Sequence, residues 1–347
     1  MAWSSPKYSR AQVDAAGRLI VSPSGPLDDI DTAFAVLSNW RSAHAFPLNT
    51  FQVGLRQRAR RIDPRTLVAQ RLKRTPSILG KLQRFPRMRL SQMQDIGGCR
   101  AVLRTVPQVR RLESAFLRAP TDHEMVTHKD YITTPKASGY RGVHFVYRYK
   151  SSRSATFNGL LIEVQLRSRI QHSWATAVET VGTLVQHALK ASEGPEQWLR
   201  FFALTSSAFA LLERSPTIPD APTGAELRRA IRSEASALRV HQRLRSYRSA
   251  LKLLEDVPVT AAQYYLLSLQ PSQERLEISG FRTDQLELAT QAYLEKERTT
   301  VGSEGAEVVL VRSESLDALR RAYPNYFLDT EVFLRHLDRV ITHALPG

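Results

Sequence analysis

Two carboxylates interrupt apolar stretches that have the pattern of strands. Asp95 lies in QDIGGCR (Gln94–Arg100) and Glu163 in IEVQLRS (Ile162–Ser168). A lone carboxylate on a strand is often only an edge residue that faces water. Two of them beside Lys and Arg clusters suit Mg²⁺, which binds through one or two carboxylates and substrate phosphates and offsets charge on a transferred pyrophosphoryl group. Gln165 shares the strand face of Glu163, because side chains alternate with a period of two.

A basic stretch precedes the first carboxylate, and few acids offset it. Its cationic side chains include Arg71, Lys73, Arg74 and Lys81. Ser77 follows Pro76, where the sequence predicts a helix start. The Ser77 hydroxyl and the free amides of the first turn would favour phosphate, and Lys81 would add charge one turn later. The alternative interpretation is a solvated helix face.

The loop Pro135–Tyr140 lies between the two carboxylates, within DYITTPKASGYRGVH (Asp130–His144). A nucleic-acid base stacking on Tyr140 would contribute roughly 1–3 kcal/mol, with Lys136 nearby for phosphate. A simple turn with a surface tyrosine is the alternative. His144 is either a core histidine on a strand or a residue that holds substrate.

Apolar periodicity predicts the helices and strands that must position these residues. We expect helices from Asp29 and over Leu48–Arg61, Pro107–Leu117, Ile170–Leu189 and Trp198–Leu212. We expect strands over Gln94–Leu103, Met125–Ile132, Gly142–Tyr149 and Leu160–Leu166. This order indicates an α+β fold, a mixed sheet with helices packed on it.

A Pro-rich segment, Ser215–Gly224, predicts a domain boundary. Beyond it we expect a basic helix, then a hairpin, a helix, a strand and two helices. The predicted organisation is a partly ordered N-terminal tail over 1–28, a main domain over 29–215, a basic helical connector over 225–256, and a small α/β domain over 260–347.

Composition limits the class of protein. The 347 residues carry a net charge of +16, and 42% are apolar, which is typical of a globular protein with polyanionic or acidic partners. No apolar run reaches the ~18 residues that a membrane span needs, and the N-terminus, MAWSSPKYSR, lacks a hydrophobic signal core, so we expect a cytoplasmic protein. A single cysteine, Cys99, excludes an internal disulfide and any multi-cysteine zinc site.

Four segments together resemble the RelA/SpoT-type alarmone synthetase domain, over roughly residues 30–215. They are RLKRTPSILGK (Arg71–Lys81), QDIGGCRAV, DYITTPKASGYRGVH and IEVQLRS, in the family's order and spacing. The resemblance implies a nucleotidyltransferase-like sheet that transfers pyrophosphate from ATP to a ribose 3′-hydroxyl with Mg²⁺. About 30 residues precede the resembling region, so we expect no hydrolase domain of the kind that the family's long enzymes carry.

The resemblance also implies a role for each candidate residue. Asp95 and Glu163 correspond to the metal-binding acids. The groups implied to hold ATP are Arg71 and Arg100, which sandwich adenine, and Lys73, Ser77 and Lys81, which contact the triphosphate. The groups implied to hold the acceptor are Tyr140, which stacks on its base, and Lys136, His144 and Gln165 beside it.

Four segments near the C-terminus have a recognisable pattern: YYLLSLQ, ERLEISGF, AEVVLVRS and LRRAYPNYFLD. They are similar to the antitoxin-like domain of fused toxic small alarmone synthetases of the CapRel type, a pseudo-zinc-finger that lacks zinc. In that subgroup a YxxY motif folds over the ATP site, and Tyr323-Pro-Asn-Tyr326 has this spacing. A tyrosine can stack on Arg71 or Arg100 as adenine does. The alternative is two core aromatics that end a helix.

This second resemblance implies an autoinhibited toxin–antitoxin of phage defence. Its substrate would be the 3′-CCA end of tRNA, and a phage major capsid protein would relieve the inhibition. Arginines suited to an acceptor stem are Arg56, Arg60, Arg61, Arg74, Arg228 and Arg232. One alternative is an ordinary synthetase that acts on GDP or GTP. Another is a non-catalytic nucleic-acid-binding module, which Asp95 and Glu163 argue against.

Overall fold

The computed structural model describes residues 3–343, apart from residues 25, 186–188, 190–192, 251, 257–261, 271–272, 274, 301–305, 314 and 328. Its helices are α1 (Arg10–Val21), α2 (Leu27–Ala43), α3 (Ala45–Ile62), α4 (Thr75–Arg84), α5 (Val106–Arg118), α6 (Arg169–Val185), α7 (Glu196–Leu212), α8 (Gly224–Ala237), α9 (Val240–Ala250), α10 (Leu286–Thr299), α11 (Leu316–Ala322) and α12 (Glu331–Thr342). Short 3₁₀ turns cover Leu90–Gln92, Ala155–Phe157 and Thr283–Gln285.

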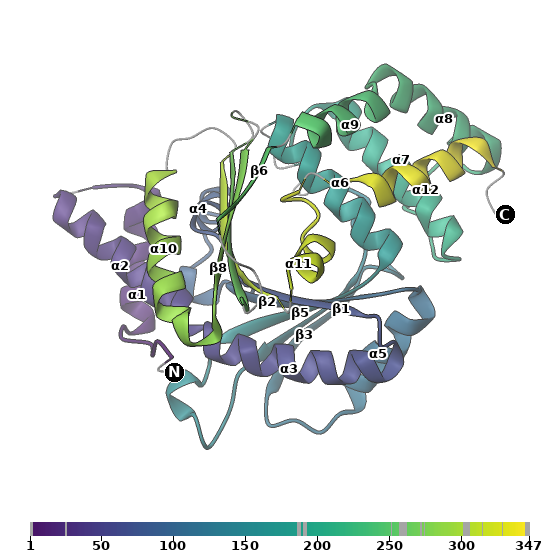
Figure 1. The fold of residues 1–347 in the computed structure, drawn as a ribbon. Helices are drawn as coiled ribbons and strands as arrows, with labels where there is room; N and C mark the ends of the chain where they lie inside the picture. Colours follow the sequence, from purple (N-terminus) through teal and green to yellow (C-terminus); the bar gives the residue numbers. More distant parts are fainter. Residues whose placement is uncertain are drawn as a thin grey trace.

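The strands of the described part join into one mixed sheet of nine, in the order β3-β4-β5-β2-β1-β9-β7-β8-β6 (Figure 1). They are β1 (Leu67–Leu72), β2 (Gly97–Leu103), β3 (Glu124–Asp130), β4 (Val143–Arg148), β5 (Leu161–Ser168), β6 (Lys252–Asp256), β7 (Tyr264–Gln270), β8 (Arg275–Phe281) and β9 (Glu307–Arg312). The expected α+β class is confirmed.

The sheet runs through both halves of the chain, whereas the sequence suggested two separate units. Strand β1, which sequence reasoning missed within the basic stretch, pairs with β2 on one side and with β9 on the other. The β1–β9 contact is short, with Gln70 opposite Arg312 and Arg71 opposite Val311. The C-terminal strands therefore extend the N-terminal sheet at its β1 edge.

Helices α3 and α5 cover one face of the N-terminal strands, and α6 and α11 lie over the other (Figure 1). In α5 the buried side chains Val109, Leu112 and Phe116 recur at helical spacing and pack against Phe145 and Val164 of the sheet. The opposite face carries polar side chains and is open to a cavity. One sheet thus has an apolar side that supplies a core and a polar side that supplies a site.

The first 28 residues are not a loose tail, and that expectation was wrong. Ser9 and Gln12 form a capping box at the start of α1, which satisfies two amides that would otherwise lack partners. Val13, Ala16 and Ile20 are buried against α2 and α4. The apolar stripe and the cap together fix a helix despite the Ser- and Pro-rich flanks.

The expected helical connector over 225–256 is also different in the structure. It forms α8 and α9, and then strand β6. Arg239, between the two helices, has a φ of 49°, a left-handed conformation that interrupts an α-helix. The sequence is basic on both sides of Arg239, so composition alone did not indicate this break.

Helix α12 packs on α6, α7 and α8 rather than on the C-terminal strands. Its Phe333 is fully buried and meets the rings of Phe201 and Phe209 edge-on. The end of the chain is therefore tied to the helical layer of the main domain. No helix in the described part of the chain is long and apolar enough to cross a membrane.

Truncating Ile20 to alanine tests whether α1 belongs to the folded core. Ile20 is 7% exposed, so Ile20→Ala should lower the free energy of unfolding by about 2–5 kcal/mol, the usual cost of an aliphatic cavity. The control Leu27→Ala removes a side chain that is 78% exposed and should change stability by less than about 0.5 kcal/mol. Urea unfolding measures both, and equal stabilities would contradict the packing of α1.

Candidate active site

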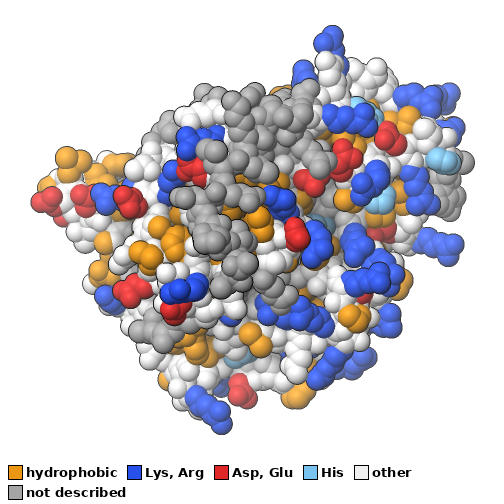
Figure 2. Space-filling view, in the orientation of Figure 1, with side chains coloured by type: hydrophobic (Ala, Val, Ile, Leu, Met, Phe, Trp, Pro, Cys, Tyr) orange, Lys and Arg blue, Asp and Glu red, His pale blue; other side chains and the backbone are white. Residues whose placement is uncertain are grey.

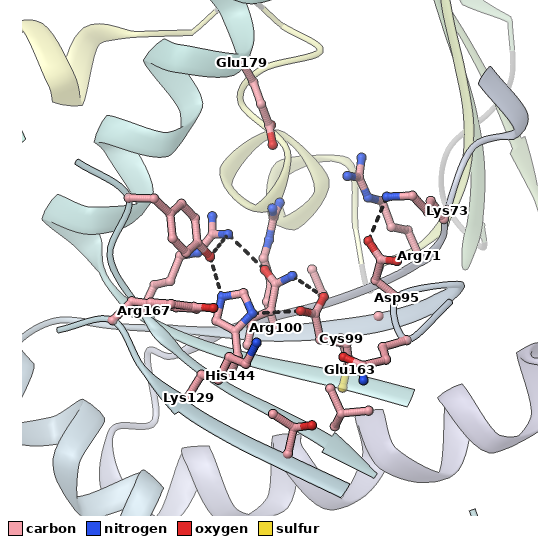
Figure 3. A pocket seen from close by; sticks show the side chains of 18 of the residues that line it. Arg71, Lys73, Asp95, Cys99, Arg100, Lys129, His144, Glu163, Arg167 and Glu179 are labelled. Atoms are coloured by element: carbon pink, nitrogen blue, oxygen red, sulfur yellow. Dashed lines mark hydrogen bonds and ion pairs between the residues drawn. The ribbon is translucent and has the colours of Figure 1, made fainter. Parts of the chain in front are cut away.

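The polar face of the sheet forms the floor of a cavity of about 400 Å³ (Figure 3). Strand pairing places the floor residues in two rows across the strands. The first row is Thr127, Val146, Glu163, Gly98 and Arg71. The second row is Lys129, His144, Gln165, Arg100 and Ala69. Residues distant in sequence therefore meet because their strands share one register.

Asp95 lies in the turn before β2 rather than on the strand itself, which corrects the predicted Gln94–Leu103 strand. Its two carboxylate oxygens each accept a hydrogen bond from a lysine, Lys73 Nζ at 2.7 Å and Lys81 Nζ at 2.9 Å. Burial would raise the pKa of Asp95, but the two lysines outweigh it and lower the pKa to about 2. Asp95 is thus an ionised group at neutral pH.

Gly97, the first residue of β2, lies very close to the neighbouring strand β5. A Cβ at this position would lie 2.8 Å from Ile162 Cδ1 of the neighbouring strand β5, closer than any side chain allows. The close approach to β5 is therefore at Gly97. A Cβ on Gly98 would meet open space instead.

Glu163 belongs to a closed ring of hydrogen bonds. His144 Nδ1 lies 2.7 Å from Glu163 Oε1, and Gln165 Nε2 donates to Oε2 at 2.6 Å. Arg167 donates to Gln165 Oε1 at 2.9 Å and to the Tyr140 hydroxyl at 2.7 Å, and that hydroxyl also contacts His144 Nε2. Burial would raise the pKa of Glu163, but His144 lowers it. The ring fixes both the charge and the orientation of Glu163.

Tyr140 is 7% exposed and lines the cavity beside cationic groups. Its ring is 5.0 Å from the guanidinium of Arg167 and 5.4 Å from Lys136 Nζ. The loop that carries it turns at Gly139, whose φ is 88° and whose added Cβ would lie 2.7 Å from Ser206 Cβ. Tyr140 is thus held rigidly at the wall of the cavity, and Lys136 also contacts Tyr131 there.

Arg71 and Arg100 point into the cavity (Figure 3) and are met by the C-terminal region. Tyr323 stacks on Arg100, with 4.6 Å between the ring centroid and Cζ, and its hydroxyl donates to the Gln70 carbonyl at 2.7 Å. Arg71 donates to the Tyr326 hydroxyl at 3.2 Å, and Arg100 donates to the Ala322 carbonyl. Both tyrosines are at least 98% buried.

The C-terminal region also contacts the start of α4. Glu297 of α10 accepts hydrogen bonds from the Thr75 amide at 3.0 Å and from the Thr75 hydroxyl at 3.0 Å. Arg41 pairs with Glu297 at 3.3 Å and donates to the Tyr293 hydroxyl at 2.7 Å and to the Lys73 carbonyl at 2.8 Å. A carboxylate therefore lies at a helix N-terminus, a position that also suits phosphate.

Of the candidate residues from the sequence, most line this one cavity. They are Arg71, Lys73, Lys81, Asp95, Arg100, Lys136, Tyr140, His144, Glu163, Gln165 and Tyr323. Ser77 is on α4 as expected but does not line the cavity. Sequence reasoning gave no site role to four charged or aromatic lining residues: Lys129, Tyr131, Arg167 and Glu179. The alternation of β5 indicated Arg167, and no sequence signal indicated Glu179.

The arginines expected to bind tRNA are dispersed. Arg74 lies 2.8 Å from Glu307 of β9 and is mostly buried, so a phosphate would have to displace Glu307. Arg56 and Arg60 line a different cavity, and Arg61 is exposed on α3. Arg228 and Arg232 are on α8, where Arg232 donates to the Ile341 carbonyl at 2.8 Å.

The donor set fits Mg²⁺ bound together with a phosphorylated substrate. Asp95 and Glu163 line the same cavity, and each is held ionised. Among the described residues, no three His, Cys, Asp or Glu side chains form a cluster that could hold a metal by themselves. Two carboxylates completed by substrate phosphates are the usual arrangement for Mg²⁺. Seven Lys and Arg but only three acids line the cavity, which favours a polyanion.

Comparison with known proteins agrees with this site. Residues 70–181 match the family described as "Region found in RelA / SpoT proteins". All cavity-lining residues other than Ala69 and Tyr323 fall within that segment. The segment 70–181, called the RelA/SpoT region below, therefore matches the family that the sequence motifs predicted.

Two relatives match similar shares of the chain. The GTP pyrophosphokinase YjbM of Bacillus subtilis is 34% identical over 116 residues, which are 33% of this chain and 54% of the relative. The uncharacterized protein Rv1366 of Mycobacterium tuberculosis is 32% identical over 136 residues, which are 38% of this chain and 45% of the relative. The chain spans about half the length of these relatives.

Solved structures align with a similar share of the chain. Small alarmone synthetase 1 from Bacillus subtilis, bound to its product pppGpp, aligns over 48% of this chain and 88% of that chain. Its identity is 26% and its TM-score 0.40. A GTP pyrophosphokinase family protein from Streptococcus pneumoniae aligns over 48% and 84%, with 27% identity and a TM-score of 0.40.

The low pKa of Asp95 predicts a pH dependence of stability. The group contributes above its ordinary pKa of 3.8 and loses that contribution as the pH falls toward about 2. Integrated over this window, the loss is about 2 kcal/mol. Asp95→Asn should therefore lose less stability than the parent between pH 5 and pH 2.5 in urea unfolding. Asp122→Asn, at an exposed position, is the control and should follow the parent; parallel curves for all three proteins would contradict the pairing.

Proposed function

We propose that the protein is an ATP-dependent pyrophosphokinase. The observation that carries the proposal is the cavity, which combines two ionised carboxylates with seven cationic side chains within the RelA/SpoT region. This combination suits a metal-bound triphosphate. The named relative YjbM, a GTP pyrophosphokinase, supports the same reaction class.

The residues that line the cavity would have different roles in the reaction. Arg71 and Arg100 present guanidinium planes on which a purine can stack, and Lys73 and Lys81 offer charge to the phosphates. Asp95 and Glu163 would hold Mg²⁺, which offsets charge on the transferred group. In the reaction the acceptor 3′-oxygen bonds to the β-phosphorus of ATP, the bond to the α-phosphate oxygen breaks, and AMP leaves. Tyr140, Lys136 and His144 lie where the acceptor would be positioned.

The arrangement supports an autoinhibited enzyme. Tyr323 stacks on Arg100, and the Tyr326 hydroxyl accepts a hydrogen bond from Arg71. The C-terminal region thus occupies the two guanidinium groups that adenine would contact. Glu297 accepts a hydrogen bond from the Thr75 amide at the start of α4. ATP and this segment would therefore compete for the same groups.

For the acceptor we propose the 3′-CCA end of tRNA, which would make the protein a toxin that blocks translation. The strongly basic chain supports a nucleic-acid substrate. We further propose that a phage major capsid protein, by binding the C-terminal region, releases Tyr323 and Tyr326 during phage defence. The likeness of the C-terminal sequence to the CapRel type supports this trigger.

The second candidate is synthesis of an alarmone from GDP or GTP. The names of YjbM and YwaC, both GTP pyrophosphokinases, favour it. Incubation with ATP labelled in the β- and γ-phosphates and either tRNA, GDP or GTP distinguishes the two candidates. Label on tRNA alone supports the first proposal, and label on GDP or GTP alone contradicts it.

Substitution of Glu163 tests the reaction class. Glu163→Gln retains the shape but removes the charge, so pyrophosphate transfer should fall at least about 100-fold, as for the loss of other charge-stabilising groups. The control Glu124→Gln alters an exposed carboxylate at the start of β3 and should leave the rate unchanged. An unchanged rate of pyrophosphate transfer in Glu163→Gln would contradict the proposed role of Glu163.

Substitution of Tyr323 tests the autoinhibition. Tyr323→Ala removes the ring from Arg100, and pyrophosphate transfer without any trigger should rise about tenfold. This rise corresponds to a closed state that is less stable by about 1.4 kcal/mol. Tyr323→Phe keeps the ring and loses only the hydrogen bond to Gln70, so its gain should be smaller. Unchanged basal transfer in a correctly folded Tyr323→Ala protein would argue against the closed state.

A further inference from the structure

A second cavity, of about 570 Å³, lies beside the candidate active site. Its walls come from the end of α3, the start of β1, the first turns of α6, helix α11 and the start of α12. The two cavities adjoin at the end of α11, because its last residue, Ala322, lines the second cavity and the next residue, Tyr323, lines the first. The C-terminal region and the RelA/SpoT region therefore meet in both.

The second cavity is strongly cationic. Its lining includes six arginines: Arg56, Arg60, Arg65, Arg169, Arg320 and Arg321. Among its described lining residues, Asp329 is the one acid. Figure 2 shows Lys and Arg side chains gathered on this face of the molecule, between α12 and the start of β1. Several of these arginines, Arg65, Arg169 and Arg321 among them, are exposed, and like charges gathered around one space favour an anionic ligand.

Other lining groups suit more than a simple anion. Leu67 and Val68 of β1 and Val332 of α12 supply apolar surface. Thr176 of α6 also lines the cavity; it is 3% exposed, and its hydroxyl has no hydrogen-bond partner in the described part of the structure. A buried hydroxyl without a partner is costly, so a ligand that reaches Thr176 gains a hydrogen bond that the protein alone does not make.

We propose that this cavity binds a nucleoside polyphosphate, at a site separate from those for ATP and the acceptor. The arginines would contact the phosphates, since a planar guanidinium matches phosphate oxygens in pairs. The apolar patch and Thr176 would contact the nucleoside. The volume is within the range of about 300–1,000 Å³ that small-molecule sites have. A concave space walled by five elements favours one small ligand over the convex backbone of an RNA.

Such a ligand would act on α11. It would bridge Arg65 and Arg169 of the RelA/SpoT side and Arg321 of α11, and so stabilise the arrangement in which Tyr323 lies on Arg100. The binding itself is independent of the proposed function. Only its consequence, stronger inhibition of pyrophosphate transfer, rests on that function.

Calorimetric titration with GTP, ATP and inorganic tripolyphosphate tests the site, at constant moderate ionic strength. Arg65→Ala/Arg169→Ala changes two exposed lining residues and should weaken GTP binding at least tenfold. The matched control Arg118→Ala/Arg153→Ala removes the same charge from exposed positions outside the cavity and should bind as the parent does. Lys73→Ala/Lys81→Ala, in the active-site cavity, should retain this binding. Melting curves verify that each variant is folded.

Several results would overturn the proposal. The site assignment fails if Arg65→Ala/Arg169→Ala binds GTP as the parent does. Equal affinities for tripolyphosphate and GTP would show that the nucleoside contributes nothing to binding, which would contradict a nucleoside polyphosphate site. If a 12-nucleotide RNA binds in an Arg65- and Arg169-dependent way while none of the small ligands binds, the surface is an RNA site instead. A parent that binds GTP here but transfers no pyrophosphate to any acceptor would contradict the proposed function alone.

Discussion

Two cationic side chains on neighbouring strands, Arg71 and Arg100, determine how the two halves of the chain meet. Burying a guanidinium is costly unless other groups replace its water. The segment Ala322–Tyr326 supplies these groups: a tyrosine ring and a backbone carbonyl for Arg100, and a tyrosine hydroxyl for Arg71. The interface therefore uses the two guanidinium groups that we propose for purine binding.

Three further connections hold this interface in place. Strand β9 extends the sheet at β1, Glu307 of β9 pairs with Arg74, and Glu297 of α10 pairs with Arg41 and caps α4. Each lies within a few residues of a group that lines the active-site cavity. Movement of the C-terminal region would thus expose the groups proposed to bind ATP at several positions together. It would also alter the arginine-lined cavity, because α11 is a wall of that cavity and Tyr323, the residue after α11, lines the active-site cavity.

Sequence reasoning predicted several helices and strands of the RelA/SpoT region and most of the residues that line the active-site cavity. Strong periodicity fixed the positions of α3, α5, β4 and β5, and the motifs placed Asp95, Glu163 and Tyr140 together. It failed where local signals were weak or composition misled. β1 was hidden in a basic run, α1 in a Ser- and Pro-rich one, and a positive φ at Arg239 divided an apparently continuous helix. Glu179 and the second cavity depend on long-range packing, which no single stretch of sequence encodes.

The central claim is that ATP and the C-terminal region compete for Arg71 and Arg100. Hydrogen–deuterium exchange of the backbone amides of α11 and β9 tests it directly, measured with and without a saturating non-hydrolysable ATP analogue and Mg²⁺. If the two compete, the analogue displaces Tyr323 and Tyr326, and exchange in α11 and β9 becomes faster. Exchange that stays the same or slows while the analogue is bound would contradict the claim.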